Sequence, residues 1–191
     1  GAPSRQGGLG GSDIWMTHKQ PNGEWSPAQN MGPNINTPGR DHCFMPLGLP
    51  GQEDTAQLIS ARPRETGGQP SDDIYVTKMV NGAWQPARRY EGKVLDSIGF
   101  KCRLGTVVRD GLILGVVSVH DLGKFHRMVF VHYDPSSKEW KGPIVDAPFN
   151  QSNVDGACPL FTTIGDKMIW SAGYDRGPGP VSAAGGTGGV Y

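Results

Sequence analysis

The chain has 191 residues with 18 basic and 18 acidic side chains, so its formal net charge is zero. This balance gives no electrostatic footprint for nucleic acid or an anionic membrane surface, and we expect no nucleic-acid partner. No apolar run approaches the roughly 18 residues that a membrane-spanning helix needs, so we expect no membrane span. The 29 glycines and 16 prolines mostly separate short apolar runs, which is typical of many strands joined by many turns.

Short runs rich in Ile, Val, Tyr and Phe predict strands along the whole chain. Residues 13–30 are expected to hold two strands around the Asn22-Gly23 dipeptide, a strong hairpin signal. Eight further strands are expected at 43–48, 55–62, 73–79, 83–89, 99–108, 112–119, 127–133 and 139–145. Residues 157–172 are expected to hold two more. No stretch shows the sustained 3.6-residue apolar spacing of a helix.

Two residue types recur in one register along the chain. The tryptophans are separated by 59 and 56 residues, at Trp25, Trp84 and Trp140. The cysteines are separated by the same two intervals, at Cys43, Cys102 and Cys158. Each cysteine therefore follows its tryptophan by 18 residues. Because independent residue types keep the same register, the sequence predicts three copies of a repeat of roughly 58 residues.

Four strands per repeat predict an all-β fold, a β-propeller built from four-stranded antiparallel blades. On this interpretation residues 1–191 form a partial propeller. Residues 13–30 are the outer half of one blade, 43–90 and 98–146 are two complete blades, and 157–172 are the inner half of another. A closed propeller usually has about four to eight blades. We therefore expect the rest of a longer chain, or a second copy, to complete the ring.

The segments GGLGGSDIW and NGEWSPAQNMGPNINT resemble the WD40-like, TolB-type repeat of outer-membrane-protein-A-associated propellers. In that repeat a glycine-rich turn precedes Asp-Ile-Tyr, and Gly-x-Trp-Ser-x-Pro and Leu-Gly-x-x-Ile-Asn-Thr follow. Residues 8–37 match closely and residues 67–86 match well, whereas Met128-Val129-Phe130 replaces Asp-Ile-Tyr in the third repeat. The resemblance implies a bacterial propeller scaffold in the periplasm or outside the cell.

Polar residues near the starts of the predicted inner strands are the candidate site, because such strands line a propeller's channel. The possible ligand contacts at the channel mouth are Asp41, His42, Cys43, Cys102, Asp155 and Cys158. A glycan hydrolase or lyase would need two convergent carboxylates there. The candidate aspartates, Asp41, Asp96 and Asp155, follow their tryptophans by 16, 12 and 15 residues and so are not at equivalent repeat positions. Aspartate also starts ordinary turns. No Ser–His–Asp, P-loop or dinucleotide fingerprint is visible.

The cysteines allow two interpretations. An arc of three thiolates is a possible site for a soft metal or for redox chemistry. The neighbours of the cysteines differ between repeats, however, and cysteine packs well inside proteins. We therefore expect three reduced, buried cysteines that fill one packing position between sheets, and no cofactor.

The sequence as a whole favours a non-catalytic scaffold or binding module that engages a protein or a cell-envelope glycan at one face. A glycan hydrolase or lyase with carboxylates at the channel mouth is the alternative, and a metal or redox protein that uses the cysteine arc is a weaker one. The repeated tryptophans are a carbohydrate-stacking surface or, as we favour, anchors of the outer strands. Asn150-Gln151-Ser152 matches a glycosylation acceptor, although such short matches are common by chance.

Overall fold

The computed structural model describes residues 6–62, 71–98, 100–120, 127–148, 150, 154–161, 167–174 and 189–190. The chain divides into unit 1, Gly1–Pro46 with Gln52–Tyr90, and unit 2, Leu47–Gly51 with Glu91–Tyr191. The named strands of both units pair antiparallel, which confirms the expected all-β class. Within the described ranges, no helix is long and apolar enough to cross a bilayer.

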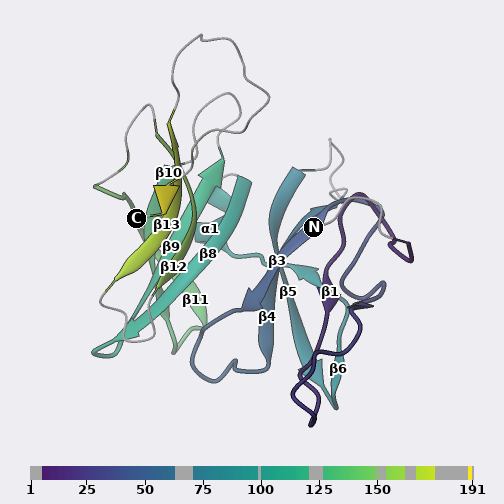
Figure 1. The fold of residues 1–191 in the computed structure, drawn as a ribbon. Helices are drawn as coiled ribbons and strands as arrows, with labels where there is room; N and C mark the ends of the chain where they lie inside the picture. The colour runs from purple at the N-terminus through teal and green to yellow at the C-terminus, as the bar shows by residue number, and fades with distance from the viewer. Residues whose placement is uncertain are drawn as a thin grey trace, which may run out of the picture. The chain divides into compact units, whose positions relative to one another are not determined.

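Unit 1 contains two antiparallel sheets (Figure 1). The strands β1 (Trp15–Met16) and β2 (Gln29–Asn30) pair at the base of a long hairpin. The larger sheet has β3 (Asp41–Pro46), β4 (Thr55–Arg62), β5 (Ser71–Val80) and β6 (Ala83–Trp84) in chain order, and β7 (Arg88–Arg89) also pairs with β5. The strand expected over 83–89 is therefore split, because Pro86 between β6 and β7 has no N–H to donate to the ladder.

The core of unit 1 lies between the two sheets. It contains Ile35, Leu58, Tyr75 and Ala87, and the side chains packed against it are Ile14, Met31, Phe44 and Trp84. Five consecutive residues of β4 are buried, so this strand is covered on both faces. The hairpin thus contributes Ile14 and Met31 to the same core as the larger sheet.

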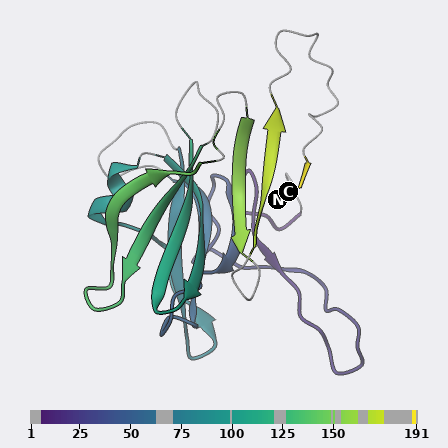
Figure 2. The same ribbon diagram turned by 90° about the vertical axis from the view of Figure 1, so that its left-hand side faces the viewer.

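Unit 2 contains a four-stranded and a three-stranded sheet. The first has β8 (Phe100–Arg109), β9 (Leu112–His120), β10 (Arg127–Asp134) and β11 (Glu139–Asp146) in chain order, and Figure 2 shows its strong twist. The second has β12 (Val154–Phe161), β13 (Met168–Tyr174) and β14 (Gly189–Val190). Asp110 and Gly111 connect β8 to β9 with φ of 50° and 76°, the positive values that a two-residue hairpin favours.

The repeated tryptophans have three different environments. Trp140, 5% exposed, packs on Gly115, where a Cβ atom would lie only 2.4 Å from the indole ring. Trp84 is half-buried and meets Phe44 edge to face, with ring centroids 5.0 Å apart. Trp25 is 66% exposed. Trp140 is therefore packed inside unit 2 as an anchor would be, Trp84 is only half-buried, and Trp25 presents its ring to solvent.

One short helix, α1 (Lys93–Ser97), was not expected from the sequence. Its five residues are too few to show a helical apolar period. Leu95 is fully buried and fixes the helix to the core of unit 2, so tertiary packing stabilises this turn.

Candidate functional site

The three cysteines share a backbone feature, an extra residue in the first strand of the three larger sheets. In β3, two residues lie between His42 and Met45, whereas only Leu58 separates their partners on β4. The same one-residue excess occurs in β8 at Cys102 and in β12 at residues 158–159. Such a bulge kinks a strand and changes the direction of its side chains. The repeat period read from the sequence therefore corresponds to a repeated bulge.

Cys43 occupies the first bulge, with a φ of 55° that is uncommon for any residue other than glycine. Its side chain is half-buried, so the expectation of full burial is wrong at this position, because the bulge turns the residue away from the regular ladder. The side chains of Cys102, Asp155 and Cys158 lie outside the described residues, and only their strands are placed. Among the side chains that the structure does describe, no three metal-ligating groups come together.

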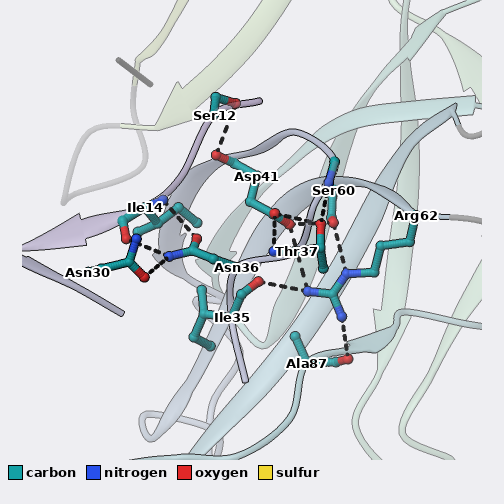
Figure 3. Close-up of polar contacts among 11 residues, drawn as sticks. Ser12, Ile14, Asn30, Ile35, Asn36, Thr37, Asp41, Ser60, Arg62 and Ala87 are labelled. Atoms are coloured by element: carbon teal, nitrogen blue, oxygen red, sulfur yellow. Dashed lines mark hydrogen bonds and ion pairs between the residues drawn. The ribbon is translucent and has the colours of Figure 1, made fainter. Parts of the chain in front are cut away.

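Asp41 begins β3 and is completely buried. Its Oδ2 accepts hydrogen bonds from the backbone N–H and the hydroxyl of Thr37, both at 2.7 Å. Its Oδ1 accepts a 2.5 Å hydrogen bond from the Ser60 hydroxyl and lies 3.7 Å from a guanidinium nitrogen of Arg62. Figure 3 shows these contacts converging on the carboxylate. Both carboxylate oxygens of Asp41 therefore have partners within the protein. This residue stabilises the fold rather than contacting a ligand.

Arg62 completes the cluster around Asp41. Its Nε donates to the Ser60 hydroxyl at 2.8 Å, and its two terminal nitrogens donate to the carbonyls of Ala87 and Ile35 at 2.9 and 2.8 Å (Figure 3). The guanidinium also lies 4.5 Å from the centre of the Tyr75 ring. The Ser60 hydroxyl is fully buried between a donor and an acceptor, so it is not placed to act as a nucleophile.

Two asparagines hold the sheets through their amides, a role that the sequence analysis did not assign to either of them. Asn36 accepts from the N–H of Ile14 at 2.8 Å and donates to its carbonyl at 2.9 Å. Asn150 makes the same pair of contacts with Met128, at 2.9 and 2.7 Å. The spacing of 22 residues in both pairs was the signal that could have identified them. Because the Asn150 amide is committed to the backbone, it is not available as a glycosylation acceptor in the folded chain.

A pocket of about 500 Å³ opens in unit 1 between the β1 hairpin and the bulge of β3. Its aromatic walls are Trp15, Phe44 and Trp84, and the remaining lining residues are Asp13, Ile14, Met16, Thr17, Met31, Asp41, His42 and Cys43. Three of the six predicted ligand contacts thus line this open pocket. Its volume lies within the range of small-ligand sites, about 300–1,000 Å³.

Asp13 differs from Asp41 although both line the pocket. Asp13 is 5% exposed, and its Oδ2 accepts from the N–H of Leu9 at 2.5 Å and from the Asn30 amide at 2.7 Å. Its Oδ1 is buried and has no hydrogen-bond partner, and no cation pairs with this carboxylate among the described residues. The lining contains no lysine or arginine. Within the described part of the chain, Asp13 therefore has no ion-pair partner, and His42 is the basic side chain of the lining.

Comparisons with protein-family models, curated proteins and solved structures find no match to this chain. The chain's own repeats and the geometry of this pocket are therefore the basis for assigning a function.

Proposed function

We propose that the chain is part of a TolB-type β-propeller that acts outside the cytoplasm as a non-catalytic binding module, and that the unit 1 pocket engages a cell-envelope glycan. Two features support the propeller. The complete repeats form sheets whose strands follow chain order, and the bulge recurs at one repeat position in three sheets. Radial repetition of four-stranded sheets is the propeller architecture. A second copy or further chain would close the ring.

The aromatic lining of the pocket is the observation that carries the binding proposal. Trp15, Phe44 and Trp84 offer flat apolar surfaces beside polar groups, the combination on which a sugar ring can stack while its hydroxyls form hydrogen bonds. The alternative, hydrolysis, would need two carboxylates that reach the ligand. Because both oxygens of Asp41 are bonded internally, this residue does not provide one of them.

Two-dimensional NMR of the tryptophan indole N–H groups tests the proposal on the full chain. On addition of the tetramer of N-acetylglucosamine, the signals of Trp15 and Trp84 should shift and saturate. Trp25 and Trp140 serve as internal controls, because the first is on the exposed hairpin and the second is packed in unit 2. Absence of a saturable shift both with this tetramer and with its de-N-acetylated form, or a shift of Trp25 alone, would refute glycan binding at this pocket.

A further inference from the structure

The charge of the pocket distinguishes between classes of sugar. Two carboxylates, Asp13 and Asp41, and one imidazole, His42, line it. Within the described residues Asp41 is paired with a cation, Arg62 at 3.7 Å, whereas Asp13 is not. Asp13 is almost as buried as Asp41, and its partners among the described residues are the N–H of Leu9 and the amide of Asn30. An uncompensated buried carboxylate lowers the free energy of a cation that binds within a few ångströms of it.

The aromatic walls of the pocket also favour a positively charged ligand. The faces of tryptophan and phenylalanine rings carry negative potential and attract ammonium groups, more strongly when the site excludes water. Met16 and Met31 add polarizable thioethers to the lining. A neutral sugar would use the flat surfaces but would leave the charge of Asp13 uncompensated. A carboxylated sugar would be repelled by it.

We infer that the pocket selects a saccharide with a free, protonated amino group, that is, an amino sugar that lacks its N-acetyl group, and that Asp13 is the specificity-determining residue. This inference rests on the proposed glycan-binding function. The ring of the sugar lies against Trp15, Phe44 and Trp84, and its ammonium group lies on the Asp13 side of the pocket. The volume of about 500 Å³ is sufficient for a hexose ring.

Calorimetric titration with a matched pair of oligosaccharides tests the inference at a pH at which the amine carries its proton. The glucosamine tetramer should bind the full chain about tenfold to a hundredfold more tightly than the N-acetylglucosamine tetramer. Asp13→Asn should reduce this preference to about threefold or less. The new amide oxygen can still accept from Leu9 and Asn30, so the pocket keeps its shape. Asp110→Asn is the control, because it removes one charge at an exposed turn of positive φ that asparagine tolerates.

A second variant does not depend on the buried network. Met16 is 46% exposed on the pocket wall, so Met16→Lys should fold normally. Met16→Lys should bind the glucosamine tetramer more weakly than the unaltered chain does. For the N-acetylglucosamine tetramer, Met16→Lys and Met16→Gln should have the same affinity. If both tetramers bind the unaltered chain equally and shift the indole signals of Trp15 and Trp84, the amino-sugar inference fails and glycan binding stands. Tetralysine that binds as tightly as the glucosamine tetramer would also overturn the inference, since charge alone would then explain the affinity.

Discussion

Replacement of Arg62 by methionine should destabilise unit 1 more than any surface substitution, because it removes the cation from a buried carboxylate. Asp41 is fully buried, and Arg62 supplies the guanidinium 3.7 Å from its Oδ1. The same side chain satisfies the carbonyls of Ile35 and Ala87. Methionine preserves the apolar stem but leaves all three acceptors without this donor.

Removing one partner of a buried ion pair costs about 3–5 kcal/mol. Because folded domains are stable by only about 5–15 kcal/mol, Arg62→Met should remove about a fifth of the stability or more. Asp41→Asn keeps an oxygen that can accept from Thr37 but replaces the other oxygen by a donor beside Ser60. The double variant should be more stable than the sum of the single changes implies, by about 1–3 kcal/mol.

Urea unfolding followed by tryptophan fluorescence measures these differences, and the dependence on urea concentration should stay unchanged between variants. Arg62→Lys should fall between the wild type and Arg62→Met, since lysine keeps the charge but not the planar set of donors. A loss below about 1 kcal/mol for Arg62→Met, the value of an exposed ion pair, would refute the reasoning.

Three further predictions concern separate parts of the chain. Gly115→Ala should cost about 1–3 kcal/mol in urea unfolding, because the new methyl group would overlap the ring of Trp140. Asn36→Asp should cost about 3 kcal/mol, because a buried carboxylate would face two acceptors to which the amide now donates. Hydrogen bonds from the Ser137 hydroxyl and from the following turn's N–H groups hold the pKa of Asp134 below its ordinary value. Ser137→Ala should therefore raise the pKa of Asp134 in an NMR titration. In the unaltered chain, the stability that the Asp134 carboxylate adds to the turn should be lost only as pH falls through its folded pKa.

Each of these has a matched control. Gly92→Ala adds a methyl group into open space and should leave stability almost unchanged. Asn81→Asp introduces the same charge as the buried asparagine variant but at an exposed turn. Ser136→Ala keeps the backbone N–H that donates to Asp134, so the pKa of that carboxyl should stay low. Equal effects from a variant and its control would show that the assigned contact is not the cause.

The strand positions could be predicted because turn signals and β-branched runs are local properties of the sequence. The expected strand at 55–62 has the bounds of β4, and the strand at 112–119 ends one residue before β9 does. The interruption near Pro86 was also readable in principle, since proline cannot donate to a ladder. The five-residue α1 was not, because Leu95 stabilises it through tertiary packing.

The candidate site was predictable only in part. The resemblance and the repeat placed Asp41, His42 and Cys43 at the start of a strand, and all three line the pocket. The internal role of Asp41 depends on its pairing opposite Ser60, a register that the local sequence does not determine. Asp13 was overlooked because its importance comes from its burial without an ion-pair partner among the described residues, which depends on distant segments of the chain.

The repeated bulge has a consequence for solubility. β3, β8 and β12 each lie at one end of their sheet's strand order. An edge strand presents backbone groups that can pair with another chain, and a protein built from similar repeats offers many copies of a compatible strand. A bulge at one position of every such edge interrupts the regular spacing of donors and acceptors. The extra residue at the cysteine position therefore disfavours edge-to-edge aggregation between repeats while still allowing each strand to pair with its own neighbour.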